Sequence, residues 1–231
     1  MQYEKTMKPF SLTNMENKNS KQNMENVFFQ PWVGSNFPSG GIFGKKIMVL
    51  GESHYCKHDC SDCGSENQKP KCASFTQERL YEYLYHYEDC DGWKKTYCKF
   101  ERALANTYTN HDQSVEIWNS LLFYNYVQIA MSESRVSPTT EQYTAGQKAF
   151  FEVLEKYRPE YILCWGKLLW QHMPNLGVRG ETIEDVDLGP VPTWEYTLSD
   201  GFVVKMIRLR HPSAGFSWDK WHRVIMEFVR G

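Results

Sequence analysis

The sequence predicts a single α/β domain, built on a central parallel sheet of about four strands with helices on both faces. The uninterrupted apolar run at residues 47–50 has the character of a strand that is buried on both faces, and further strands are predicted from the largely apolar stretches at residues 121–126, 161–165 and 202–209. Apolar residues recur at helical spacing between these runs, and such alternation of strands and helices implies a parallel sheet with right-handed crossovers. A chain of 231 residues, 15% of them aromatic, suits one domain with a large core.

The first part of the chain differs in composition from the rest. Residues 1–26 are rich in Asn and Lys and contain few apolar residues, so they are predicted to be a disordered tail. The domain itself is expected to cover residues 27–231. Residues 30–41, which contain several Gly, Pro and Ser residues, are predicted to form a loop before the first strand.

A cysteine-rich insertion at about residues 56–73 follows the first strand. Its spacing is C-x3-C-x2-C-x8-C, and the four residues are Cys56, Cys60, Cys63 and Cys72. A loop with so few core residues needs another source of order, and four thiolates around one zinc ion would supply it. A structural zinc is the first interpretation and an iron–sulfur cluster is the second. The remaining alternative is a reduced, metal-free loop.

Helices account for most of the remaining chain. They are predicted from residue 74 onward and at residues 94–108, 138–157, 167–172 and 218–229. The helix after Pro138 is expected to be capped by Thr139 or Thr140 and to end before Pro159. The prolines and glycines between residues 174 and 192 predict an irregular segment.

Polar side chains cluster where the predicted strands end. Glu52, Ser53 and His54 come directly after the first strand, Asn125 ends the second, and His211 follows the last. In open α/β sheets, ligands bind just outside the carboxyl ends of the strands. We therefore expect the functional site at this edge.

These strand-end residues occur in an order that resembles a known motif set, that of the uracil-DNA glycosylase superfamily. The motifs are Gly51-Glu52-Ser53-His54-Tyr55, Asn125, Trp165-Gly166 and His211-Pro212-Ser213. The resemblance extends from about Val27 to the C-terminus. It implies the fold of that superfamily and hydrolysis of the N-glycosidic bond of uracil, or a related damaged base, in DNA. No cofactor is implied for the chemistry, and the enzyme would be a hydrolase of DNA repair.

The resemblance implies catalytic roles for three residues. His211 would donate a hydrogen bond to a carbonyl oxygen of the departing base, where negative charge develops. Relatives carry Asp or Asn at the position of Ser53, where it holds the attacking water. A serine hydroxyl has no charge with which to stabilise the cationic sugar. Glu52 is therefore the candidate for orienting water or stabilising that cation.

Base and DNA contacts are implied for further residues. Asn125 would read the pairing edge of uracil, because one amide offers a donor and an acceptor together. Tyr55 would wall the pocket, Gly51 belongs to the same motif, and Phe75 is a candidate for stacking on the base, with core packing as the alternative. The remaining candidates, for contacts with the DNA backbone, are Pro212, Ser213, Lys220 and Arg223.

Composition limits the other properties of the protein. The formal net charge of −2 does not favour strong nonspecific binding to nucleic acid, although a local basic patch remains compatible with it. The chain has no apolar stretch that could cross a membrane and no signal-peptide core at its N-terminus. We expect a cytoplasmic monomer whose partner is DNA, with cysteines that are free, metal-bound or catalytic.

Two other functions remain open from the sequence. The first is a nucleic-acid-binding protein of the same fold that is catalytically weak or inactive, which the serine at position 53 would explain. The second is a metal- or thiol-centred enzyme that uses the cysteine cluster. Close cysteine spacing favours a closed structural site over an open catalytic one.

Overall fold

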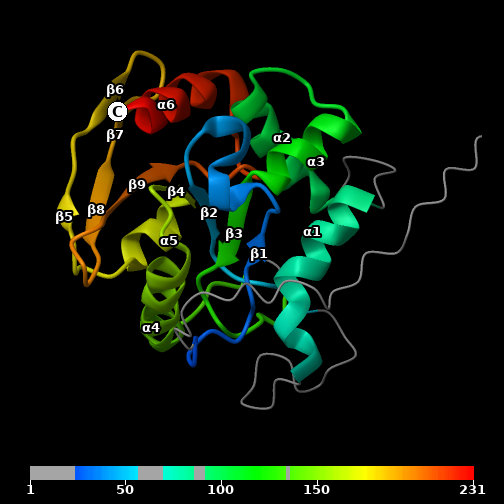
Figure 1. Cartoon of the computed structure of the whole chain (residues 1–231), viewed down its shortest axis with the longest axis vertical. Helices are drawn as coiled ribbons and strands as arrows, with labels where there is room; N and C mark the ends of the chain where they lie inside the picture. The colour runs from blue at the N-terminus through cyan, green and yellow to red at the C-terminus, as the bar shows by residue number, and fades with distance from the viewer. Residues whose placement is uncertain (1–23, 57–69, 86–91, 134–135) are drawn as a thin grey trace, which may run out of the picture.

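The computed structural model describes residues 24–56, 70–85, 92–133 and 136–231, which form three layers with a sheet between two layers of helices (Figure 1). The strands are β1 (Trp32–Val33), β2 (Ile47–Gly51), β3 (Leu121–Asn125), β4 (Tyr161–Trp165), β5 (Val178–Arg179), β6 (Ile183–Asp185), β7 (Gly189–Val191), β8 (Thr193–Thr197) and β9 (Val203–Leu209). The α-helices are α1 (Phe75–Tyr85), α2 (Lys94–Ala105), α3 (His111–Asn119), α4 (Thr140–Tyr157), α5 (Lys167–His172) and α6 (Trp218–Arg230). Short 3₁₀ helices occupy Phe37–Ser39, Gly41–Phe43 and Pro70–Ser74.

The four predicted strands form the centre of the sheet, in the order β3-β2-β4-β9, and each neighbouring pair is parallel. Every residue of β2, β3 and β4 is buried, as the uninterrupted apolar runs predict.

The estimate of about four strands is too small, because the sheet in the described residues has seven strands. The additions, β1 at one end and β8 and β5 at the other, are all antiparallel to their neighbours. β6 and β7 pair only with each other. These strands fall in segments whose Gly and Pro residues indicated loops, yet such residues are tolerated in short edge strands and hairpins.

The two faces of the sheet bury different helices. Helices α1, α2, α3 and α6 pack on one face and share a core with Val49, Phe123 and Leu163. On the opposite face, α4 and α5 share a second core with Leu50 and Cys164. The capping box of α4 forms as the sequence indicates, with Thr139 as the N-cap residue.

The order of the strands creates a topological switch point between β2 and β4. The chain passes from β2 to β3 on one side, then crosses back over β2 to β4, and continues away to β9. Neighbouring strands whose connections leave in opposite directions form a topological switch point, where ligands bind in open α/β sheets. Glu52 directly follows β2, and Gly166 directly follows β4, so both lie at this point.

Outside the sheet, the structure differs from two sequence predictions, which concern the N-terminal tail and the cysteines. The predicted tail ends earlier than residue 26, because the Asn26 backbone N–H donates to Glu152 Oε2 over 2.9 Å; residues 1–23 lie outside the described residues. The expectation that the cysteines are free or metal-bound is wrong for Cys98, which is disulfide-bonded. Within the described part of the chain, none of the helices has the length and apolar character that crossing a bilayer requires.

Candidate functional site

Glu52 lies at the carboxyl end of β2, where helix α4 supplies a hydrogen bond to it. The Tyr143 hydroxyl donates to Glu52 Oε1 over 2.6 Å, and the Tyr143 ring stacks on His172 with centroids 3.9 Å apart. Burial and the Glu52 carboxylate both raise the pKa of Tyr143, so the phenol keeps its proton and stays a donor. Among the described residues, Glu52 Oε2 has no hydrogen-bond partner, which leaves that oxygen available to a ligand or water.

Ser53 follows with an unpaired hydroxyl. Its Oγ is buried and has no hydrogen-bond partner among the described residues. Buried polar atoms in folded proteins are almost always paired, so an exception of this kind needs an explanation. The hydroxyl lies next in sequence to the Glu52 carboxylate and can pair with a water molecule or a substrate group.

His54 is enclosed and neutral. It is 5% exposed, Phe75 stacks on the ring with centroids 4.6 Å apart, and Phe29 contacts it edge-on at 4.8 Å. Its Nε2 lies 2.8 Å from the Thr76 hydroxyl. Burial first, and then the positive charge of Arg79, lower the pKa of His54 to about 3.

The Asn125 side chain lies on the same ring. Its Nδ2 is 3.2 Å from His54 Nδ1 and 3.1 Å from Nε2. These two ring nitrogens flank Cε1, so an atom equally close to both would overlap Cε1 if it were in the ring plane. The amide therefore lies over the face of the imidazole, as in an N–H···π contact. Phe75 stacks on the imidazole as well, so an aromatic ring and an amide both contact the His54 ring.

Close packing of β2 against β3 fixes the position of Asn125. Gly51 pairs with Asn125 in the parallel register, and a Cβ at Gly51 would lie 2.1 Å from Asn125 Oδ1. Glycine is therefore required for the amide to occupy this place. The structure thus brings Gly51 and Asn125 into contact, and their role in base binding stays a prediction.

His211 lies beyond β9 and beside the end of β4. The Ser213 backbone N–H donates to His211 Nδ1 over 3.2 Å, and the Ser213 hydroxyl is 2.8 Å from the same nitrogen. Because Nδ1 accepts, the ring proton is on Nε2. Burial lowers the pKa of His211, which favours this neutral form.

Neighbouring residues hold the His211 ring in place. Trp165 contacts the ring edge-on at 6.0 Å, Gly166 adopts a φ of 101° beside it, and Pro212 is buried. Nε2 has no hydrogen-bond partner in the described part of the chain. The imidazole can therefore donate one hydrogen bond to a ligand at the carboxyl edge.

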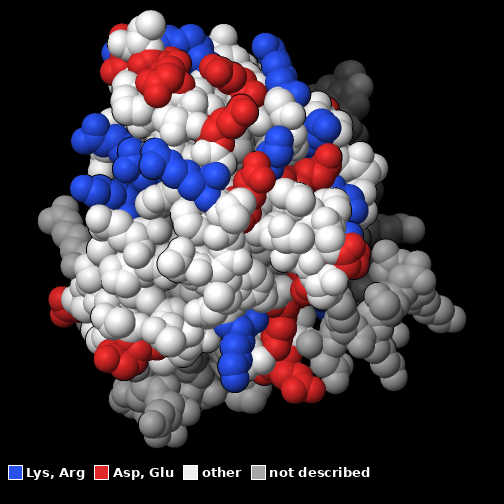
Figure 2. Space-filling view, turned by 90° about the vertical axis from the view of Figure 1, so that its left-hand side faces the viewer, with Lys and Arg blue, Asp and Glu red and all other residues white. Residues whose placement is uncertain are grey.

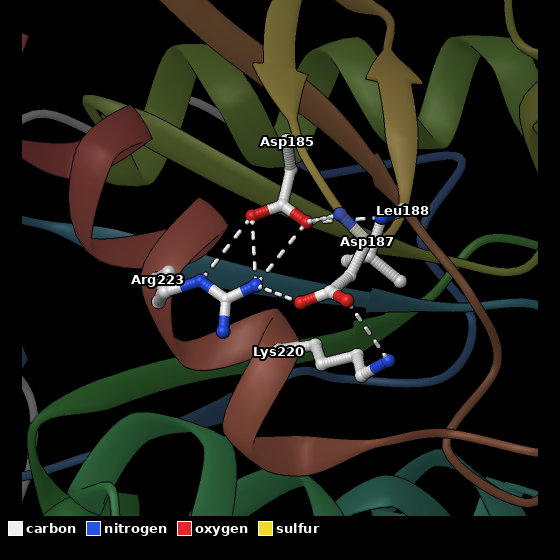
Figure 3. Close-up of polar contacts among 5 residues, drawn as sticks. All are labelled: Asp185, Asp187, Leu188, Lys220 and Arg223. Atoms are coloured by element: carbon white, nitrogen blue, oxygen red, sulfur yellow. Dashed lines mark hydrogen bonds and ion pairs between the residues drawn. The ribbon is translucent and has the colours of Figure 1, made fainter.

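Lys220 and Arg223, predicted to contact DNA, are engaged within the protein (Figure 3). The Arg223 guanidinium donates to Asp185 and, over 2.6 Å, to Asp187, and Lys220 Nζ is 3.3 Å from Asp187. Hydrogen bonding from Arg223 and then from Lys220 holds the pKa of Asp187 below its usual value. These pairs join α6 to the β6–β7 hairpin and offset the positive charge that DNA would need.

Other predicted site residues are more scattered. Tyr55 is 42% exposed and pairs through its backbone with Met131, and the Ser213 side chain is exposed next to His211. Figure 2 shows a group of Lys and Arg on the side of the molecule that carries β5 and β8. A local basic surface is thus present despite the negative net charge.

The proposed metal ligands are only partly described. Cys56 and Cys72 are free thiols of intermediate exposure, whereas Cys60 and Cys63 lie outside the described residues. Within the described residues, no group of three or more His, Cys, Asp or Glu side chains is arranged to hold a metal ion. The four-cysteine site therefore stays a prediction.

Sequence reasoning missed Tyr143 and Thr76, which hold Glu52 and His54. Both are on helices, and neither is next to a motif. The only available signal for Tyr143 was its place in the first turn of the helix after β3, since that turn lies near the carboxyl edge.

No protein-family model and no curated protein sequence matches this chain. The interpretation of the site therefore depends on its own residues and geometry.

Proposed function

We propose that this protein is a base-excision enzyme of the uracil-DNA glycosylase type, which hydrolyses the N-glycosidic bond of uracil or a related damaged base in DNA. The observation that carries the proposal is the presence, at one sheet edge, of three complementary groups. These are the Glu52 carboxylate with an available oxygen, the Asn125 amide and the His211 imidazole with an available Nε2–H.

Breaking this C–N bond places positive charge on the sugar and negative charge on the departing base. Glu52 is the group that stabilises the sugar or orients the attacking water, and the unpaired Ser53 hydroxyl offers that water a second contact. His211 donates from Nε2 to a carbonyl oxygen of the base as its charge grows. A fixed donor of this kind contributes about 3 kcal/mol in a site that excludes water.

The topology supports the same assignment. The four parallel strands carry the motifs in chain order, and each motif lies at or just beyond the carboxyl end of its strand, with the motifs of β2 and β4 at the topological switch point. DNA would approach this edge through the His211-Pro212-Ser213 turn, with Asn125 as the base reader. Structural zinc held by Cys56, Cys60, Cys63 and Cys72 would order the insertion and supply no chemistry.

A specific observation favours the binding-only alternative as the second candidate. Ser53 carries no charge, and the His54 ring already occupies the faces of Phe75 and Asn125 that a base would use. A protein with this arrangement could bind DNA and hydrolyse slowly or not at all. Base release and DNA binding must therefore be measured separately.

The decisive experiment is single-turnover release of uracil from single-stranded and duplex oligonucleotides. Wild type, Glu52→Gln and His211→Ala would be compared, with Glu116→Gln as an exposed carboxylate control on α3. We expect release by wild type and by the control, and a loss of about a hundredfold in each of the other two variants. Absence of release by wild type, with oligonucleotide binding intact, would reject excision of uracil and favour the binding-only function.

A further inference from the structure

The walls around His54 have the geometry of a slot for a flat ring. One face of the imidazole is stacked on Phe75 at an interplanar angle of 28°, and the Asn125 amide lies over a face as well. Thr76 approaches the ring edge at Nε2 over 2.8 Å, and Phe29 closes a side. Arg79 lies 5.0 Å from the Phe75 centroid and braces that wall by a cation–π contact.

This arrangement differs from that of a histidine that serves only the core. A buried imidazole usually pairs both ring nitrogens with partners near the ring plane. Here only Nε2 has such a partner, the Thr76 hydroxyl, while the one polar contact of Nδ1 in the described residues is the amide above the ring. The slot therefore suits a planar ring with polar edges and is not matched to imidazole alone.

We propose that His54 fills the base pocket of the proposed function, where it contacts Phe75 and Asn125, and that a planar nitrogen heterocycle, a pyrimidine base in the first instance, enters only by displacing the imidazole. The His54 ring atoms stand in for those of the base. While His54 is in place, Phe75 cannot stack on a base and Asn125 cannot read one. This inference rests on the proposed function for the identity of the ligand, and it makes His54 a determinant of which bases enter.

The test measures binding of free uracil by calorimetry to the full chain. Wild type, His54→Ala and His54→Ser would be compared, with His222→Ala as a control that removes another imidazole, one bonded to the Ala103 carbonyl oxygen between α2 and α6. We expect both His54 variants to bind uracil at least about tenfold more tightly than wild type and the control, because the ring no longer competes. Adding Phe75→Leu to His54→Ala should remove this gain.

Two results would overturn the proposal. The first is uracil affinity in the His54 variants no greater than in wild type, or a gain that survives Phe75→Leu. The second is failure of both His54 variants to fold, since an occupant that must leave cannot be indispensable to the fold. Base release from oligonucleotides separates the two proposals. Uracil binding by His54→Ala without release by any variant would retain the slot and reject the glycosylase, whereas release by wild type without any gain in binding would do the reverse.

Discussion

Two glutamates, Glu52 at the end of β2 and Glu101 on α2, show how packing decides whether a polar group is available for chemistry. Glu101 on α2 is fully buried, and its carboxylate accepts hydrogen bonds from the Ser114 hydroxyl over 2.8 Å and from Trp118 Nε1 over 3.1 Å. The Thr109 hydroxyl also donates to it. Glu52 is only partly buried and, within the described residues, accepts one side-chain hydrogen bond, from Tyr143. Saturated with donors, Glu101 joins α2 to α3, whereas Glu52 keeps an oxygen for a ligand.

The two histidines of the site repeat this contrast. His54 is 5% exposed, contacts Phe75 and Asn125, and lies within hydrogen-bond distance of Thr76 at Nε2, so it cannot contact a ligand without moving. His211 is fixed through Nδ1 and keeps Nε2 available. Residue type and position after a strand are alike in the two cases, and only the surrounding contacts separate them.

The largest effect on stability is expected from Glu101→Ala. Removing the carboxylate leaves several buried donors unpaired, which should lower the free energy of unfolding by about 3 kcal/mol or more. Urea unfolding would measure it, with Glu52→Gln as the comparison, which should change stability by less than about 1 kcal/mol. Glu101→Gln should lie between the two because its amide oxygen still accepts. Equal stability losses at positions 101 and 52 would contradict the distinction between the two carboxylates.

A smaller effect on stability is expected from Gly51→Ala, where β2 packs against Asn125. The new Cβ would lie 2.1 Å from Asn125 Oδ1, so the amide must move away from His54. Overpacking of this kind should cost about 2 kcal/mol of stability. In a double-mutant cycle measured by urea unfolding, Asn125→Ala should relieve most of that cost, because it removes Oδ1, the atom with which the new Cβ clashes. Additive costs would show that the clash is not with the Asn125 amide.

The sequence allowed the centre of the fold to be predicted, because β2, β3 and β4 are buried on both faces and β9 is largely apolar. The edge strands β1, β5 and β8 escaped prediction. β1 and β5 have only two residues each, and their pairing depends on neighbours that come from distant parts of the chain. The side chains of β8 do not alternate regularly between buried and exposed, so its sequence lacks a clear strand pattern. The prolines and glycines before it suggested an irregular segment.

At the site, the strand-end residues could be predicted but their partners could not. Glu52, Asn125 and His211 lie where the carboxyl ends of parallel strands require. Tyr143 reaches Glu52 across 91 positions of sequence, and no local pattern reveals such a contact. Lys220 and Arg223 appeared suited to DNA because they are cations on one helix, yet the acidic β6–β7 hairpin that pairs with them is more than 30 positions away.

Tyr143→Phe tests whether Glu52 needs its single donor. Loss of a hydrogen bond to a carboxylate is expected to lower the single-turnover rate of uracil release by about tenfold, equivalent to about 1.4 kcal/mol. Oligonucleotide affinity should stay within about twofold of wild type, since Tyr143 positions the carboxylate and does not contact DNA. Tyr157→Phe, on the same helix and without a bonded hydroxyl in the described residues, is the matched control. Equal rates for the two variants would remove Tyr143 from the site.

The smallest effect concerns pH and His211, because its ring is only partly enclosed. Burial lowers its pKa from the usual 6.5, so the native state binds this proton less tightly than the unfolded chain does. Stability that depends on neutral His211 should therefore be complete above pH 6.5 and decrease as pH falls through 6.5 toward the native value. The difference in unfolding free energy between wild type and His211→Gln, followed by urea unfolding from neutral to mildly acidic pH, measures this term alone. A difference that grew in favour of wild type on acidification would mean that a carboxylate stabilises the imidazolium. The donor at Nε2 would then belong to a charged ring and not to the neutral ring that Ser213 holds.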